Sequence, residues 1–554
     1  MSDHDPALVG MKEELEAAYG RLRPWAQEVL RLLVARFGPL PAEQEELARL
    51  ALQEGLSGAH VRASLRLLQS CGLVEAMPKA WREHQYRVPE EHVAYWQEKL
   101  FPRLEPETEE RCWGGEGTRN EPGDAVKDVL QVLLVASRGE LKLLKSGGLS
   151  GQSVRRLEQA LLARREEVEA SGLAAAAPHL YGPAVTVALH MAAASGLLQV
   201  DNGLLRPAEE AVQAWLGKPY AVLNQELYAI WKKAVAPALN GWEFHALYAL
   251  EMALPGRWYP LNHLFDWLRV CGMMDLDCMA QMGFISTRLV PMGAWGWLCL
   301  EQRDSGMAFM LPAPVAALQE KDSEPCFAGI IVQPDLEIIV PPNPPPRLWW
   351  ALLQWGEWTV RGEISVFRLT PRSMGAGRTA GGSVEALIGH IRDNSKVDID
   401  EGVIHFIREQ GGGRSGDRAA GPGIHAQETP GPVRALEPLL AGVTAEDGAV
   451  REPGDAYPAA PEPEPLPAEV PAAWWAMGRR GHPSTEKEMV RRAIAMKTAI
   501  RFETDGRGEV MVVPLRILEE AEDWELYGMQ GRLEVRLKPR EWTGLRLVWP
   551  GIHE

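Results

Sequence analysis

The first hundred residues carry apolar side chains at helical spacing, at Trp25, Val29, Leu32 and Leu33. The pattern predicts a helix that ends at Gly38-Pro39, a second helix over 42–54 and a third helix that Ser57 caps. Two strands are predicted next, beginning at Leu73 and at Gln85. Three helices followed by a two-stranded hairpin is the element order of a winged-helix domain.

A similar order recurs further along the chain. Residues 185–194 are predicted to form a helix, after which Asp201-Asn202-Gly203 joins two short strands through a tight turn. A third and less regular copy is predicted between Leu227 and Gln319, with Gly283-Phe284-Ile285 opening its wing. The chain is therefore expected to hold tandem winged-helix-like domains.

Two stretches lack an apolar period and are predicted to be linkers. Residues 104–123 are rich in Glu and Gly, and residues 411–481 are rich in Pro, Gly and acidic side chains. Such compositions bury too little apolar surface to offset the entropy of ordering the chain, so disorder is expected. An apolar island at 474–477 interrupts the second linker. We expect it to pack against a neighbouring domain rather than to serve as a docking motif.

The C-terminal region, residues 482–554, is predicted to form a helix and a small β-barrel. Thr485 and Glu488 have the spacing of a capping box at the start of the helix. Alternating apolar residues then predict strands at 500–502, 510–514, 524–527 and 533–537. A helix followed by several short strands is typical of a closed, SH3-like barrel.

The predicted fold class is α+β multidomain. The α+β class follows from the helices and short strands predicted above, and several domains are expected because 554 residues are several times the length of one domain. The linkers divide the chain into winged-helix-like domains at 1–103 and 124–218, a helical or winged-helix-like domain at 219–320, a small α/β domain at 321–410, and the helix with its barrel at 482–554.

Composition narrows the class of protein. The six cysteines form no CxxC pair, which favours a reducing, cytoplasmic setting, and no apolar run is long enough for a membrane span. The net charge of −17 argues against binding nucleic acid over the whole surface. It permits a local basic face, and it suits a chain whose partners are proteins.

No motif of a known catalytic centre is present in the sequence. The single Gly-Lys pair, Gly217-Lys218, is followed by Pro219 instead of the hydroxyl residue that a nucleotide-binding loop needs. The GxGxxG match at Gly411, Gly413 and Gly416 falls in a predicted linker and is attributed to chance. HExxH, paired Cys or His ligands and GxSxG are all missing. We expect no cofactor, no metal and no enzyme activity, with catalysis at an unfamiliar site as the remaining alternative.

Residues 327–409 carry three motifs in order: Gln333-Pro334-Asp335-Leu336-Glu337-Ile338, Phe367-Arg368-Leu369-Thr370, and Asp400 to Ile407. This region resembles the helicase-associated, non-motor domain that precedes the motor of XPB-type helicases, a domain also found in stand-alone bacterial proteins. The resemblance implies a helicase partner, for which Gln333, Asp335 and Glu337 are the candidate contacts, unless they only build the domain's own sheet. The C-terminal region is similar to WYL-type sensing modules, with Trp524-Glu525-Leu526-Tyr527 as the nearest approach to the triplet.

Local basic clusters give the candidate DNA contacts. The third helix of a winged helix enters the major groove and the wing meets phosphates. The candidates are His60, Arg62 and Arg66 on the helix, Lys79, Arg82 and Arg87 on the wing, and Lys142, Lys145, Arg155 and Arg156 in a second cluster. The alternative is that they are ordinary solvated charges on protein-docking modules. The twenty tryptophans are expected in cores rather than in stacking with bases.

These features predict a non-catalytic accessory or scaffold protein in DNA transactions, linked to a helicase in repair or transcription. Its expected partners are duplex DNA and a helicase, repair or transcription protein, with no membrane and no metal. The alternative is a winged-helix transcriptional regulator whose C-terminal barrel senses a ligand.

Overall fold

The computed structural model describes residues 6–79, 84–106, 123–144, 148–169, 181–275, 277–303, 306–312, 327–342, 344–362, 364–412, 466–476, 482–504, 508–519 and 524–552. Most of both predicted linkers lies outside these residues. The described chain is mixed α/β, with small antiparallel sheets that each belong to one structural unit.

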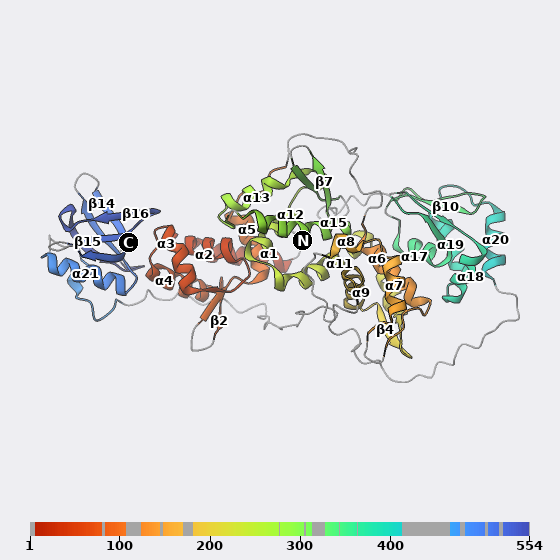
Figure 1. Ribbon diagram of the computed structural model, residues 1–554, viewed down its shortest axis with the longest axis horizontal. Helices are drawn as coiled ribbons and strands as arrows, with labels where there is room; N and C mark the ends of the chain where they lie inside the picture. The colour runs from red at the N-terminus through yellow and green to blue at the C-terminus, as the bar shows by residue number, and fades with distance from the viewer. Residues whose placement is uncertain are drawn as a thin grey trace.

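The units form an elongated row whose order differs from the chain order (Figure 1). The C-terminal unit lies at one end, beside the first unit. The third unit, the second unit and the unit at 327–412 follow along the row. The last part of the chain therefore contacts the first part.

The first unit contains three helices and a hairpin as predicted, but the second predicted helix begins at Gln44 rather than at Ala42, because Ala42 and Glu43 pair with the strand at 84–87. Its elements are α1 (Pro6–Gly20), α2 (Pro24–Phe37), β1 (Ala42–Glu43), α3 (Gln44–Gln53), α4 (Gly58–Ser70), β2 (Glu75–Pro78), β3 (His84–Arg87) and α5 (Glu90–Leu100). The sheet has the order β1-β3-β2. The hairpin begins at Glu75 rather than at Leu73, because Gly72 adopts a φ of 70° and Leu73 donates its N–H to Leu68 in the turn that ends α4.

The second unit confirms the predicted tight turn. It contains α6 (Ala125–Ser137), α7 (Gly151–Ala160), α8 (Arg165–Val168), α9 (Pro183–Ala194), β4 (Leu198–Asp201), β5 (Leu204–Pro207) and α10 (Glu209–Leu216). Asn202 and Gly203 between the strands have φ values of 48° and 75°, as a primed hairpin turn requires.

The third unit places its hairpin later than predicted. Its elements are α11 (Tyr220–Val235), α12 (Gly241–Glu251), β6 (Trp258–Pro260), α13 (Leu261–Val270), α14 (Cys278–Phe284), a π-helix (Ile285–Leu289), α15 (Val290–Ala294), β7 (Cys299–Arg303) and β8 (Gly306–Met310). The prediction that Gly283-Phe284-Ile285 opens a wing is wrong. These residues stay helical because buried Phe284 packs on Trp242 from within the helix. The hairpin is β7–β8, and the sheet order is β6-β8-β7.

The unit at 327–412 is a four-stranded antiparallel sheet with helices packed on it. Its elements are β9 (Ile331–Val332), β10 (Glu337–Val340), α17 (Pro346–Trp355), β11 (Glu357–Val360), β12 (Ser365–Arg368), α18 (Pro371–Thr379), α19 (Val384–Asn394) and α20 (Glu401–Gly411). The strand order is β11-β12-β10-β9. This mixture of strands and helices agrees with the small α/β domain expected at 321–410.

The C-terminal unit differs from the expected closed barrel. It contains α21 (Pro483–Ala495), β13 (Ala499–Thr504), β14 (Gly508–Glu519), β15 (Trp524–Gln530), β16 (Leu533–Leu537) and β17 (Trp542–Val548). The sheet order is β16-β15-β14-β13-β17, and no described residues pair β16 with β17. A 3-10 turn at Pro539–Glu541 separates these two strands, and its proline has no N–H to donate to a ladder.

The start of α21 also corrects an expectation. The predicted capping box at Thr485 and Glu488 is wrong, since Pro483 sets the first turn earlier and Nδ1 of His482 accepts the N–H of Ser484. The apolar island before this helix does pack as predicted. Trp475 is buried and meets Trp549 edge to face at 5.8 Å between ring centres.

Two large clusters of buried apolar side chains fill the row, and a small third cluster of Ala499, Val513 and Val548 has Leu52 of α3 packed against it. One continuous cluster of buried apolar side chains runs from Leu15 to Ile407 through the first four units. A second cluster fills the C-terminal unit and contains Trp475, Trp524, Trp542 and Trp549. The first four units are therefore one block, and the C-terminal unit has a core of its own. No helix within the described ranges has the length and apolar character that crossing a bilayer would need.

Candidate nucleic-acid interface

The cap of α4 contains the first candidate residue, His60. Oγ of Ser57 accepts the N–H of His60 at 3.4 Å, and the N–H of Ser57 is donated back to Nδ1 of His60 at 3.3 Å. This is a capping box with histidine in the place of the usual Glu or Gln. The side chain of His60 is 3% exposed, so its ring is committed to the cap rather than turned outward.

The two arginines of α4 lie in different surroundings. Nη2 of Arg62 donates to the carbonyl of Met496 at 2.9 Å, so this candidate is engaged by the C-terminal unit. Arg66 lies one turn further along α4 and is exposed. On this helix Arg66 is therefore exposed, whereas Arg62 is hydrogen-bonded to the C-terminal unit.

The candidate cations near the β2–β3 hairpin are held by ion pairs within their own sheet. Lys79 pairs with Glu43, and Nε of Arg87 donates to Glu75 at 2.8 Å. Arg82 lies outside the described residues. All four paired side chains are more than a third exposed, so solvent screens each ion pair, and a phosphate could replace the carboxylate at little cost.

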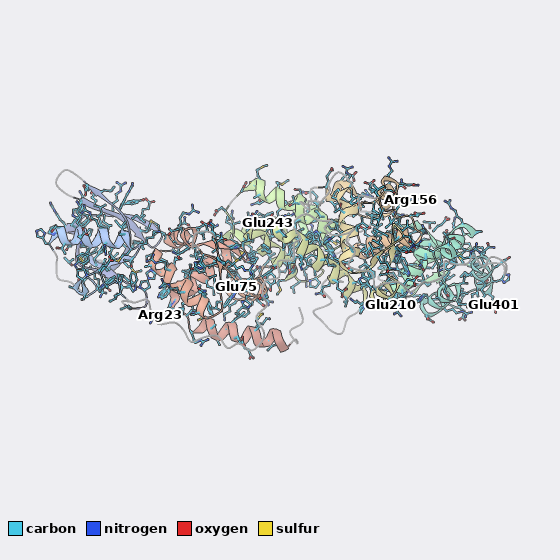
Figure 2. All side chains as sticks on the ribbon, turned by 90° about the horizontal axis from the view of Figure 1, so that it is seen from below. Arg23, Glu75, Arg156, Glu210, Glu243 and Glu401 are labelled. Carbon is cyan, nitrogen blue, oxygen red and sulfur yellow. The ribbon has the colours of Figure 1, made fainter. Side chains whose placement is uncertain are left out.

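The second basic cluster is brought together by the start of α7. The backbone N–H of Lys142 is donated to Oγ of Ser153 at 3.0 Å, which places Lys142 beside that helix. Arg155 and Lys142 are exposed, and Arg156 pairs with Glu140 at 3.1 Å, while Lys145 lies outside the described residues. Figure 2 shows Arg156 far along the row from Glu75 of the wing. The two clusters therefore do not form one continuous surface.

The candidate partner contacts, Gln333, Asp335 and Glu337, lie at the turn between β9 and β10. The N–H of Gln333 is donated to the carbonyl of Glu337 at 2.8 Å, and Leu336 adopts a φ of 71° within the turn. Oδ1 of Asp335 accepts the N–H of Glu337 at 3.3 Å. Glu337 pairs with Arg368 of β12, so of the three side chains Asp335 is the most outward-facing.

The tryptophans of the same unit form its core, as predicted. Trp349 and Trp355 are 2% and 1% exposed. Trp349 meets both Phe367 and Trp358 in T-shaped contacts, and Trp358 stacks on Phe367, so the three rings pack against one another. Lys127 of α6 lies 4.5 Å from the ring centre of Trp349, which joins the second unit to this one.

A cluster on the C-terminal sheet was not predicted. Arg516, Tyr527 and Arg536 stand directly opposite one another on β14, β15 and β16. The two guanidinium groups lie 4.6 and 5.9 Å from the centre of the tyrosine ring, and both arginines are exposed. A hydrogen bond to Glu534 is the main cause that raises the pKa of Tyr527. The alternation of side chains along a strand predicts which face of the sheet each residue occupies. The pairing register of β14, β15 and β16, which the sequence does not reveal, brings the three residues together.

The comparisons with known proteins agree with the unit at 327–412. Residues 330–412 match the family model described as the helicase conserved C-terminal domain. The matched range begins at the buried Ile330 before β9 and ends just after α20, so it coincides with a folded unit. The chain matches no curated protein. No group of three potential metal ligands occurs within the part of the chain that the structure describes.

Proposed function

We propose that this chain is a non-catalytic accessory protein in helicase-linked DNA transactions, binding duplex DNA, a helicase partner, or both. The observation that carries the proposal is a helicase-type unit at 330–412 in a sequence with no nucleotide-binding loop. Motor activity would need amides and a lysine to hold the phosphates of a nucleotide. The unit is therefore assigned a docking role.

The row of units supports a scaffold. The helicase-type unit lies at one end of the block and the first unit near the other (Figure 1). One continuous core joins them, so the distance between these two binding regions is fixed by packing rather than by a linker. A scaffold of this kind would hold DNA and a partner at a set separation.

The first unit is the proposed DNA-binding module. Its order of helix, short strand, two helices and hairpin, with the sheet order β1-β3-β2, fits a winged helix. In such a module α4 would enter the major groove, and the loop between β2 and β3 would approach the backbone. Arg66 is then the exposed cation that lies nearest to the bases or phosphates.

The test is a titration of the full-length protein into labelled duplex and single-stranded DNA, followed by fluorescence anisotropy over a salt series. We expect salt-sensitive duplex binding that Arg66→Glu weakens by about tenfold, because a phosphate or base contact becomes a repulsion. Arg49→Glu on α3 is the matched control. Arg49 is 74% exposed and lies on a different helix, so its reversal should change binding much less. An absence of binding at low salt, both by this protein and by variants in which the C-terminal unit is released from α4, would exclude direct DNA contact by this chain.

The second candidate function is a transcriptional regulator that senses a ligand. The row Arg516–Tyr527–Arg536 favours it, since two cations and a ring on an exposed sheet could hold an anionic aromatic ligand. A regulator should prefer one operator over random duplex by at least about a thousandfold, whereas the accessory protein should show little preference. Selection of bound sequences from a random duplex pool separates the two.

A further inference from the structure

The C-terminal unit supplies part of the cap of α4. The first N–H groups of a helix have no partner within the helix. Ser57 accepts one of them, and the N–H of Ala59 is donated to the carbonyl of Lys497 at 2.8 Å. Lys497 has a φ of 52°, a left-handed conformation uncommon for a lysine, just after the end of α21. The cap of α4 is thus completed by a residue from the far end of the chain.

Side chains on both sides strengthen this contact. Glu45 accepts Nζ of Lys497 at 2.6 Å. Glu54 accepts both Nε and Nη2 of Arg532, at 3.0 and 2.9 Å. Arg62 adds its hydrogen bond to Met496, and Ala59 is buried in the core cluster of the C-terminal unit. Opposite charges therefore face each other across the joint, with the acidic residues on α3 and at its end.

Glycines allow the two backbones to come together. A Cβ atom at Gly58, the first residue of α4, would lie 2.9 Å from Cβ of Lys497. A Cβ atom at Gly55 would lie 2.8 Å from Cα of Gly531. Neither neighbour is the flexible end of a side chain, so larger residues could not be placed here without moving the unit. The fit between the units is specific.

The same joint has features of a contact that can open. The C-terminal unit keeps its own core, and the joint is not completely filled. A cleft of about 370 Å³ remains between the units, lined by residues that include Trp25, His60, Arg501 and Met511. The flanking ion pairs are partly exposed, and salt screens such pairs. Separation would keep the core of the first four units and most of the core of the C-terminal unit, and it would expose Ala59 and Leu52, which pack against the C-terminal unit.

We propose that the C-terminal unit competes with DNA for the start of α4. This inference rests on the proposed function, because it matters only if α4 enters the groove. While the unit is docked, it covers Ala59 and occupies Arg62, so the first turn of α4 cannot approach a base pair. When the unit separates, Arg62 becomes available to a phosphate and the N-terminus of the helix is uncovered. DNA binding and docking are then mutually exclusive.

The experiment uses two full-length variants that weaken docking without touching the exposed face of α4. Gly58→Ala places a methyl group against Lys497, and alanine favours a helix over glycine, so α4 itself should not unfold. Arg532→Glu sets two carboxylates against each other at Glu54. Arg491→Glu makes the same charge change on α21 of the same unit, at a side chain that is 54% exposed and has no part in the joint described above, and serves as the control.

Docking is read from hydrogen exchange of the Ala59 amide, and DNA binding from anisotropy with labelled duplex. Both docking variants should exchange faster at Ala59 and bind duplex about three to ten times more tightly than the unaltered protein. Arg491→Glu should show neither gain. Faster exchange with unchanged duplex binding would overturn the competition while leaving the proposed function intact. If exchange becomes faster and no variant binds duplex at low salt, the proposed function at α4 fails, and the competition fails with it.

Discussion

Two helices of this protein begin with a glycine at a joint between units. A Cβ atom at Gly241, which begins α12, would lie 2.5 Å from the carbonyl oxygen of Arg36 at the end of α2. A Cβ atom at Gly58, which begins α4, would lie 2.9 Å from Cβ of Lys497. Backbones approach closely at both joints, yet the surroundings differ.

The first joint is buried and the second is bordered by solvent. At the first, His245 is fully buried, with Nε2 2.6 Å from the carbonyl oxygen of Val34 and Nδ1 2.7 Å from Oε1 of Gln97. At the second, Lys497 and Arg532 form their ion pairs at the edge of the joint. A glycine contact inside a continuous core makes a permanent block, whereas the same contact beside exposed charges makes a joint that can open.

The largest effect is expected from His245→Leu. The substitution removes the contacts of a fully buried ring with the Val34 carbonyl and with Oε1 of Gln97, which should cost about 3 kcal/mol, although the carbonyl still accepts the N–H of Gly38 and the Gln97 amide still donates to the backbone carbonyl at 245. Calorimetry of the full chain should show a lower transition temperature for the block and an unchanged transition for the C-terminal unit. His263→Leu, at an exposed position on α13, is the control and should change stability little. Equal shifts in both transitions would contradict the division into two cores.

The pH dependence of the block should follow from the same histidine. Burial lowers the pKa of His245 from 6.5 to about 4, against the opposing effect of the Val34 carbonyl. Above pH 6.5 both the folded and the unfolded chain hold the ring neutral. As the pH falls toward 4, only the unfolded chain takes up the proton, so the block should lose roughly 3 kcal/mol of stability.

Denaturant unfolding between pH 7 and pH 4 measures this loss. His92 and His190, whose pKa values burial also lowers, act in the same direction. His245→Gln should therefore reduce the pH dependence without removing it. If the free energy of unfolding of His245→Gln depends on pH as steeply as that of the unaltered protein, His245 does not titrate as proposed.

The third prediction compares the two glycines directly. Gly241→Ala should destabilise the block by about 2 kcal/mol, because the methyl group meets the backbone of Arg36 and Phe37 in a closed core. Gly58→Ala should leave the block as stable as before, because the C-terminal unit can move away. Thermal unfolding of the two variants side by side measures the difference. If Gly241→Ala and Gly58→Ala destabilise the block by similar amounts, the second joint is as rigid as the first.

Local chemistry explains which elements could be predicted. The turn at Asn202-Gly203 was predicted because those two residue types accept positive φ values without help from the rest of the fold. The helix predicted over 185–194 is likewise present, as α9. By contrast, β1 and β11 are short strands that exist through their pairing with β3 and β12, and no local signal marks them.

The candidate site shows the same limit. The sequence marks Arg62 as a cation on a helix, but its partner Met496 lies 434 residues further along the chain. Periodicity also cannot show that β16 and β17 stay apart, since each strand alternates as a barrel strand would. Residue type identifies candidates, and only tertiary packing shows which of them are covered.

The smallest effect is expected from the ion pair between Glu54 and Arg532. Arg532→Glu and Glu54→Arg should each weaken docking, and the double variant should restore it with the charges exchanged. Because Arg532 is 74% exposed, the coupling between the two changes should be about 1 kcal/mol or less. Hydrogen exchange at Ala59 reports docking in all four proteins. The coupling should shrink at about 1 M salt, where the screening length falls to about 3 Å. A coupling near zero at low salt would mean that the glycine contacts alone hold the two units together.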